Sequence, residues 1–144
     1  ILVTHDQKEA LSMSDKIGVI HQKKLVQFDT PKNLFEKPKT LYVANFLSQI
    51  NILPNFLFNN LDENPSKNFI IRVEKTKLTN IKNDYELQID DLSYCGNYNE
   101  VELSFEKNPT FKINARIHID DEISLDKNLY LDLNKKDILS VNIN

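Results

Sequence analysis

The chain has 144 residues, of which 40% are hydrophobic and 27% are charged, and its formal net charge at pH 7 is −3. This composition is typical of a folded chain of one ordinary domain or two small ones, and it excludes intrinsic disorder. A mildly acidic chain lacks the basic stripe with which nucleic-acid-binding domains replace phosphate counterions, so we expect no nucleic-acid partner.

Residue content excludes several kinds of site and segment. Cys95 is the only cysteine, so no internal disulfide can form. Gly18 and Gly96 are the only glycines, which excludes a glycine-rich loop around phosphate groups. No apolar run approaches the roughly 18 residues of a membrane-spanning helix. No secretory leader pattern opens the chain, so we expect none.

The first predicted elements are a strand and a short helix. Residues 1–4 are apolar without alternation, which favours a strand buried on both faces, as in a parallel sheet. Asp6 and Glu9 have the spacing of a capping box, and Thr4 and Gln7 offer an overlapping one. Either pair predicts a helix that ends near residue 13.

A hairpin and two further helices follow. Residues 16–21 and 24–29 predict two strands whose two-residue connection has the length of a hairpin turn. Thr30, followed by proline, predicts a helix that ends before Pro38. Thr40 predicts the cap of the next helix, which carries an apolar face.

The pattern changes near residue 51. Residues 52–68 are rich in Asn and interrupted by prolines, which predicts an irregular segment. Alternating apolar and polar residues then predict about six strands with one buried face each. The inward positions are Ile71, Val73, Tyr85, Leu87, Ile89, Val101, Leu103, Phe105, Phe111, Ile113, Ala115, Ile117, Ile119, Leu129, Leu131, Leu133, Leu139, Val141 and Ile143. This set favours a small closed barrel, which removes the exposed edges of a sheet.

Residues 1–51 also carry an ordered series of short motifs. In order they are Thr4-His5-Asp6-Gln7, Glu9-Ala10, Asp15, Gln27, Thr30-Pro31, Pro38, Tyr42-Val43-Ala44, Phe46-Leu47 and Asn51. This series resembles the C-terminal end of the nucleotide-binding subunit of ABC importers. Three glycines of that family's pattern are replaced by residues in predicted turns, namely Lys23, Asp29 and Ser48.

The second half resembles the transport-associated OB domain, known as TOBE, that many importer ATPases carry. Arg72-Val73-Glu74 stands where that family has Arg-Pro-Glu, and residues 92–96 stand where it has an apolar-x-Tyr-Leu-Gly turn. The two resemblances imply an α+β chain that is mainly β. Residues 1–50 are expected to be the strand–helix–hairpin–helix remnant of an α/β ATPase domain. Residues 51–144 are expected to be an OB-like regulatory β-barrel.

His5 is the switch histidine by this resemblance, and in the family that residue contacts the γ-phosphate of ATP and helps to sense the partner subunit. An imidazole suits this role because one nitrogen can donate to a phosphate oxygen while a neighbour holds the other. A single histidine after a strand is otherwise usually a loop or surface residue. The family's phosphate-binding loop, acidic residues and signature motif lie before residue 1. We therefore expect ATP and Mg²⁺ to bind only in the intact parent ATPase, and this chain alone neither to bind nor to hydrolyse ATP.

Other candidate site residues have a structural interpretation beside the functional one. His21, His118 and Cys95 do not form a metal-binding spacing, so we interpret the histidines as structural or solvated and the cysteine as a small buried hydrophobe. The acidic residues 90–91 and 120–122 lack the spacing of a calcium loop, so no metal site is expected.

A pair of charged residues and a group of aromatic residues also have a structural interpretation. Arg72 and Glu74 alternate with apolar neighbours, which predicts that they face solvent or a partner. Tyr94, Tyr98 and Phe105 could stack nucleic-acid bases, although the charge balance favours packing in the core or at its rim.

Three functions remain open at this point. The first is the C-terminal regulatory part of an importer ATP-binding subunit, in which the barrel braces the ATPase dimer or binds a small effector. The second is a free-standing OB module for nucleic acid or oligosaccharide, and the third is a dimerisation module without a ligand. The resemblance favours the first, and it is closer to ferric-iron or polyamine importers than to the sugar type.

The resemblance also implies partners and a location. It implies a second copy of the chain in a homodimer and membrane permease subunits in the intact complex, at the inner face of the cell membrane. The unpaired apolar edge at residues 1–4 points the same way, because such an edge recruits a second copy or folds back on the barrel.

Overall fold

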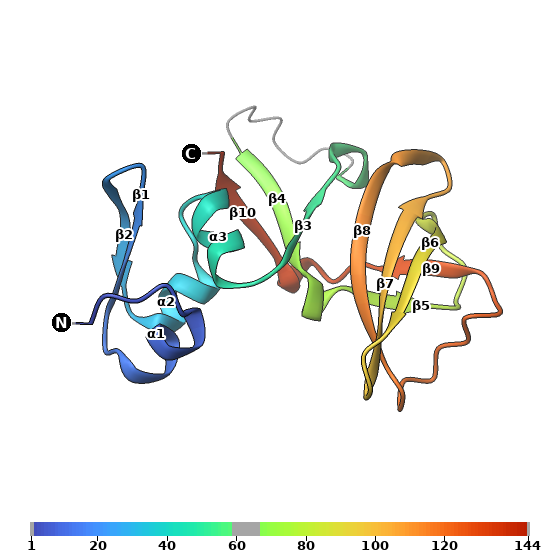
Figure 1. The fold of residues 1–144 in the computed structure, drawn as a ribbon. Helices are drawn as coiled ribbons and strands as arrows, with labels where there is room; N and C mark the ends of the chain where they lie inside the picture. The colour runs from blue at the N-terminus through green and yellow to red at the C-terminus, as the bar shows by residue number, and fades with distance from the viewer. Residues whose placement is uncertain (1, 59–66, 144) are drawn as a thin grey trace.

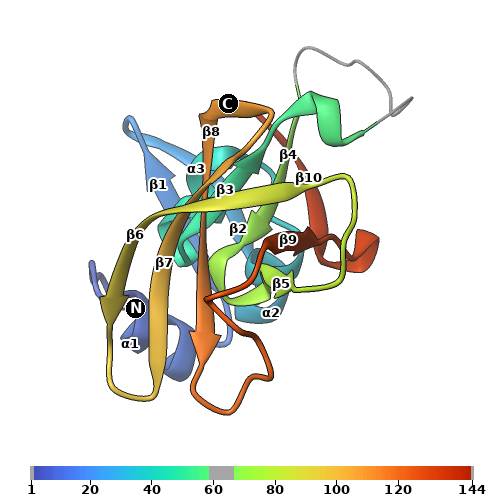
Figure 2. The same ribbon diagram turned by 90° about the vertical axis from the view of Figure 1, so that its right-hand side faces the viewer.

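The computed structural model describes residues 2–58 and 67–143. A two-stranded hairpin with three short helices lies at one end, a three-stranded sheet lies in the middle and a five-stranded sheet lies at the other end (Figure 1). Figure 2, turned by 90°, shows the long strands of the five-stranded sheet in front of the helices. The described residues are thus mainly β with a few short helices, which confirms the coarse part of the predicted fold class.

The N-terminal part, which we call the hairpin–helix module, contains the elements that local signals predict. They are α1 (Gln7–Met13), β1 (Ile17–His21), β2 (Lys24–Asp29), α2 (Pro31–Glu36) and α3 (Leu41–Leu47). Each helix begins at a side-chain cap, because backbone N–H groups donate to Asp6, Thr30 and Thr40. The predicted helix starts and the predicted hairpin are confirmed.

A small apolar cluster holds this module together. Its fully or nearly buried members are Val19, Leu34, Val43 and Leu47, which come from β1, α2 and α3. Leu11 of α1 packs against them as a partly buried residue. The module therefore has a core of its own, and α1 is fixed to it.

The strand predicted over residues 1–4 is wrong in its described part. Residues 2–4 adopt no regular secondary structure, and Leu2 and Val3 are 53% and 93% exposed. Ile1 lies outside the described residues. This exposure also contradicts the expectation that the segment folds back on the barrel. A parallel strand needs neighbours for its backbone hydrogen bonds, and the described part of the chain places none beside it.

The middle layer is an antiparallel sheet in the order β10-β4-β3. It consists of β3 (Ile50–Leu53), β4 (Lys67–Arg72) and β10 (Ile138–Asn142), and the short 3-10 turn η1 (Asn55–Leu57) follows β3. The irregular segment predicted over residues 52–68 is therefore corrected at both ends, because β3 and β4 extend into it. Residues 59–66 of that segment lie outside the described residues.

β4 does not alternate as predicted, because both of its faces are buried. Ile70 and Ile71 are both 0% exposed. Ile70 packs with Ala44 and Val141, whereas Ile71 belongs to the larger core of the five-stranded sheet. The predicted strand position Val73 instead begins the 3-10 turn η2 (Val73–Lys75).

The remaining strands form a sheet in the order β5-β9-β6-β7-β8. They are β5 (Lys77–Thr79), β6 (Glu86–Tyr94), β7 (Tyr98–Phe105), β8 (Asn108–His118) and β9 (Leu129–Asp132), and the turn η3 (Lys135–Asp137) precedes β10. Of the five inward positions predicted over 111–119, the middle three are buried. Phe111 and Ile119 are 40% and 60% exposed, because β8 ends at His118 and its first half extends beyond the core.

The two edge strands of this sheet, β5 and β8, contact each other, so the sheet is strongly curled. The strand pairings recorded for residues 2–58 and 67–143 do not include a β5–β8 ladder. Closure of the sheet into a barrel therefore stays a prediction. No helix within these ranges is long and apolar enough to cross a membrane.

Candidate functional site

His5 lies on an exposed bend directly before α1. The next residue, Asp6, caps the helix by accepting a hydrogen bond from the Glu9 backbone N–H at 3.0 Å. This bond lowers the pKa of the Asp6 carboxyl below its ordinary value. The Thr4 hydroxyl accepts from the Asp6 backbone N–H at 3.0 Å and fixes the bend from the other side. The histidine is thus held at the start of an anchored helix, with its ring open to solvent.

Arg72 was predicted to face solvent or a partner, and this prediction is wrong. Its side chain is only 3% exposed. The guanidinium donates to the Phe35 carbonyl at 2.6 Å and to the Ala44 carbonyl at 3.4 Å, and it stacks 3.7 Å from the centroid of the Phe35 ring. Burial lowers the pKa of Arg72, and the nearby Glu74 carboxylate opposes that shift. Arg72 therefore joins β4 to the carboxyl-terminal turns of α2 and α3.

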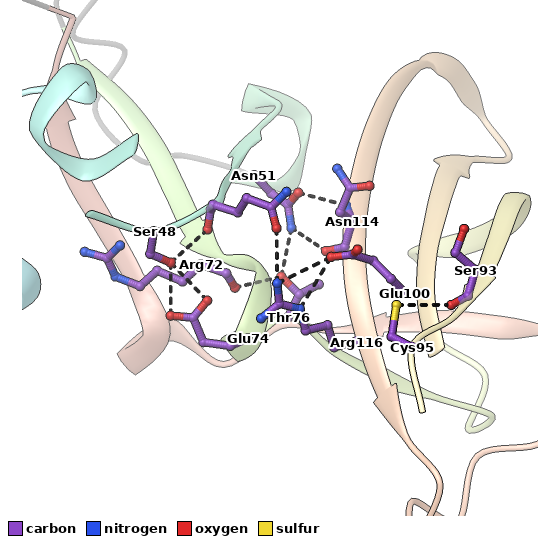
Figure 3. Close-up of polar contacts among 11 residues, drawn as sticks. Ser48, Asn51, Arg72, Glu74, Thr76, Ser93, Cys95, Glu100, Asn114 and Arg116 are labelled. Carbon is purple, nitrogen blue, oxygen red and sulfur yellow. Dashed lines mark hydrogen bonds and ion pairs between the residues drawn. The ribbon is translucent and has the colours of Figure 1, made fainter. Parts of the chain in front are cut away.

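Glu74 is exposed, as predicted, and it binds the hairpin–helix module. The Ser48 hydroxyl, at the end of α3, lies 3.1 Å from each oxygen of the Glu74 carboxylate. The backbone N–H of Val73 donates to the Gln49 carbonyl at 3.1 Å. The Gln49 side chain in turn accepts from Arg116 of β8 at 3.3 Å. Polar contacts thus connect α3, η2 and β8 (Figure 3).

Asn51 connects the middle sheet to the five-stranded sheet. It is 3% exposed, and its side-chain amide nitrogen donates to the Asn114 carbonyl at 2.7 Å and to the Thr76 hydroxyl at 2.8 Å. Its amide oxygen accepts from the Asn114 backbone N–H at 2.8 Å. The Thr76 hydroxyl donates to the Arg72 carbonyl at 3.0 Å. Figure 3 shows these contacts between the ribbons of the two sheets.

Sequence reasoning placed Asn51 at the end of a family motif but gave it no role. A single Asn next to an apolar strand reads as a loop residue. The available signal was its position, two residues before a buried Leu53, where a polar side chain requires partners. Among the described residues, no buried side-chain nitrogen or oxygen lacks a hydrogen-bond partner.

Comparison with known proteins identifies relatives of the chain. No protein-family model matches it. The chain is 37% identical over 112 residues to the spermidine/putrescine import ATP-binding protein PotA of Bacillus thuringiensis, which covers 74% of this chain and 32% of the relative. It is 52% identical over 52 residues to PotA of Trichormus variabilis, which covers 36% of this chain and 14% of the relative. It is 28% identical over 156 residues to the sulfate/thiosulfate import ATP-binding protein CysA of Mesostigma viride, which covers 94% of this chain and 44% of the relative.

The chain is homologous to the ATP-binding subunits of ABC importers. It spans about a third of the length of the curated relatives it matches. The predicted resemblance to importer ATP-binding subunits is confirmed, and the assignment of the second half to a TOBE domain stays a prediction.

The name of these subunits implies a nucleotide site, and a phosphate-binding loop is the feature of such a site that can be sought among residues 2–58 and 67–143. Gly18 lies within β1 and Gly96 in the turn between β6 and β7, so neither opens a helix. At the start of each of α1, α2 and α3 one backbone N–H donates to the helix's own cap. The described residues thus form no phosphate-binding loop beside His5.

The other candidate site residues, His21, His118 and Cys95, lie in three different environments. His21 stacks on Tyr42 with ring centroids 3.7 Å apart, which is the structural role predicted for it. His118 is exposed at the end of β8, 5.9 Å from the Tyr98 ring. Cys95 was predicted to be buried, and this is wrong, because it lies exposed in the turn between β6 and β7.

The aromatic residues considered as a stacking surface do not share one face. Phe105 is 2% exposed in the core, whereas Tyr94 is 72% exposed at the end of β6. Two open pockets lie near the start of β6. One, of about 430 Å³, is lined by Phe56, Asp84, Tyr85, Glu86, Phe105, Lys107 and Asn108. The other, of about 490 Å³, is lined by Glu86, Leu87, Gln88, Ile89, Glu106, Leu125, Lys127, Asn128 and Leu129.

Proposed function

We propose that the chain is the C-terminal part of the ATP-binding subunit of an ABC importer. In this proposal residues 1–50 complete the ATPase domain, and residues 51–144 form the regulatory barrel that modulates or braces the ATPase dimer. His5 acts as the switch histidine only when the rest of the subunit supplies the nucleotide site. The homology to PotA over three quarters of the chain is the observation that carries the proposal.

The position of His5 supports this role. Its ring is exposed, yet its backbone is held by the Asp6 cap, and α1 is anchored in the module by Leu11. A group that contacts phosphate needs both access and a fixed position, because phosphoryl transfer depends on positioning and charge stabilisation. When the remaining subunit places a phosphate beside it, His5 donates one hydrogen bond to an oxygen atom.

The outer face of the hairpin is apolar and exposed, which suits a surface that another part of the subunit covers. Ile20, Leu25 and Phe28 are 66%, 62% and 58% exposed. Leu25 and Phe28 both lie against Gly18, and Ile20 pairs with Leu25 across the hairpin, so the three share one face. Exposed apolar patches of this kind mark surfaces that another body covers. We assign this face, together with Leu2 and Val3, to contact with the rest of the ATPase domain.

The names of the relatives support a proposal for the transported substrate, and the family resemblance supports one for the assembly. PotA is named for spermidine and putrescine import and CysA for sulfate and thiosulfate import. We propose a polyamine importer, a second copy of the subunit as dimer partner, permease subunits as membrane partners, and a location at the inner face of the membrane.

A chimera tests the proposal. The part of PotA from Bacillus thuringiensis that precedes the matched segment is fused to residues 1–144, and its steady-state ATP hydrolysis is measured. We expect turnover, and we expect His5→Ala to lower kcat on the order of a hundredfold, as the loss of one charge-stabilising donor does elsewhere. His118→Ala is the matched control, because that histidine is exposed on β8, and it should retain the rate.

Two results contradict the proposal. One is an unchanged ATPase rate in the His5→Ala chimera. The other is saturable ATP binding by residues 1–144 alone in a calorimetric titration, since the chain would then hold a nucleotide site that its residues do not explain.

A further inference from the structure

A series of hydrogen bonds, joined through the side chain and backbone of Arg72, crosses the molecule from the hairpin–helix module to β8. It starts at the Phe35 carbonyl of α2, which accepts from the Arg72 guanidinium at 2.6 Å. The Arg72 carbonyl accepts from the Thr76 hydroxyl at 3.0 Å, and that hydroxyl accepts from the Asn51 amide at 2.8 Å. Asn51 ends the chain on the backbone of Asn114 in β8. We call Arg72, Thr76, Asn51 and the Asn114 backbone the polar relay.

We propose that the polar relay is a conformational coupling device, with Asn51 as its positioning residue, that fixes the five-stranded sheet relative to the hairpin–helix module. β8 is an edge strand, and an edge strand presents unpaired backbone groups. The Asn51 amide takes one donor and one acceptor of Asn114, the same pair that a neighbouring strand would take. The Asn51 side chain therefore pairs with β8 in place of a neighbouring strand, and this pairing involves only one residue of β8, Asn114.

The geometry of Asn51 allows one arrangement of the two sheets. Its amide has two N–H groups and one oxygen within this site, and each has a partner at 2.7 to 2.8 Å. A rotation of the five-stranded sheet breaks at least one of these bonds inside a buried site, where an unpaired polar group is costly. Directional contacts of this kind fix an angle, which apolar contacts do not.

The apolar contact between the helices and the middle sheet is small. The cluster between α3 and the middle sheet has three buried members, Ala44, Ile70 and Val141. The larger core joins the middle sheet to the five-stranded sheet, because Leu53 of β3 and Ile71 of β4 pack with the apolar residues of the five strands. The polar relay is a buried polar contact that passes from the helices, through β4 and η2, into the far sheet, and the Gln49–Arg116 contact runs beside it at the surface.

The consequence for regulation rests on the proposed function. The hairpin–helix module carries His5 through α1, so a displacement of the barrel that opens the Asn51–Asn114 contact releases the position of that module. The relay would then report the state of the barrel to the nucleotide-contacting histidine.

Spin labelling of the isolated chain tests the relay without any nucleotide. One label is placed on the native exposed Cys95, which follows β6, and the other on Lys24→Cys at the start of β2. The hairpin and the five-stranded sheet lie at opposite ends of the molecule (Figure 1). Pulsed electron–electron distance measurements should give one narrow distribution in this background. Asn51→Ala should lose it and give a broad distribution, while circular dichroism retains the β signal.

Asn114→Ala is the matched control, because only the backbone of Asn114 takes part and the relay stays intact. Thr76→Val keeps the side-chain shape and removes the hydroxyl, and it should broaden the distribution as Asn51→Ala does. It decides the matter if Asn51→Ala does not fold. The proposal is overturned if the distance distribution of Asn51→Ala stays as narrow as that of Asn114→Ala. Where Asn51→Ala does not fold, the same comparison is made with Thr76→Val. This result leaves the ATPase test of His5 unaffected.

Discussion

Arg72→Met removes the buried cation and retains most of the apolar volume of the side chain. In the folded chain the guanidinium holds the Phe35 carbonyl at 2.6 Å and covers the Phe35 ring at 3.7 Å. The Ala44 carbonyl also accepts from the Ser48 backbone N–H at 3.3 Å, so it keeps a partner in the variant. The main loss is therefore at Phe35.

The size of the loss follows from two contacts and one offset. A hydrogen bond from a charged donor contributes about 1.5–3 kcal/mol. Stacking of a guanidinium on an aromatic ring contributes about 0.5–2 kcal/mol. Removing a cation from a buried position regains part of this, as the lowered pKa of Arg72 indicates. We expect Arg72→Met to lower the free energy of unfolding by about 2–3 kcal/mol, which lowers the melting temperature by roughly 5–10 °C.

Urea unfolding followed by circular dichroism measures this difference by linear extrapolation. Arg116→Met is the control, because its guanidinium pairs with Glu100 at 3.4 Å while 33% of the Arg116 side chain stays exposed. An ion pair whose two side chains are about a third exposed contributes about 1 kcal/mol or less. If Arg72→Met is no less stable than Arg116→Met, the role assigned to the buried guanidinium is refuted.

Two smaller changes test the hairpin–helix module. Lys23→Gly should raise the free energy of unfolding by about 0.5–1 kcal/mol. Lys23 has a φ of +64°, and glycine relieves that strain at some cost in chain entropy. Lys24→Gly is the control within β2, and it should give no gain in the same urea experiment. Asp29→Asn should lower the melting temperature at pH 7. The Asn33 amide donates to the Asp29 carboxylate and lowers its pKa, so the ionised form stabilises the fold above about pH 4, and the difference between the chains should shrink as the pH falls through the folded pKa. A difference that stays constant from pH 7 to pH 3 would speak against this interpretation.

Local signals predicted the elements whose causes are local. Thr30 followed by proline set the start of α2, and Thr40 set the start of α3, because a cap depends on a few adjacent residues. The hairpin was found from two strand-like runs and a short connection. Even its departure from the family pattern has a local expression, since Lys23 adopts the positive φ for which glycine is suited.

The failures concern residues whose environment comes from distant segments. Residues 2–4 have the sequence of a buried strand, but a strand forms only beside another strand. The described part of the chain places no strand beside these residues. Arg72 alternates with apolar residues, so it reads as solvent-facing, yet the ends of α2 and α3 bring two carbonyls over it. Ile70 and Ile71 are both buried because β4 lies between two cores. No period within the sequence carries that information.

Arg72 and Asn51 both belong to motifs by which the chain resembles importer ATPases, and both are buried, whereas His5 is exposed. A nucleotide contact therefore does not account for their place in those motifs. The structure gives them a common role, since the Thr76 hydroxyl joins the Arg72 carbonyl to the Asn51 amide. A buried cation and a buried amide are costly groups with which to join two layers, and apolar residues would do so with less loss. What polar groups provide is a single orientation, and orientation is what a barrel must keep if it is to act on an ATPase.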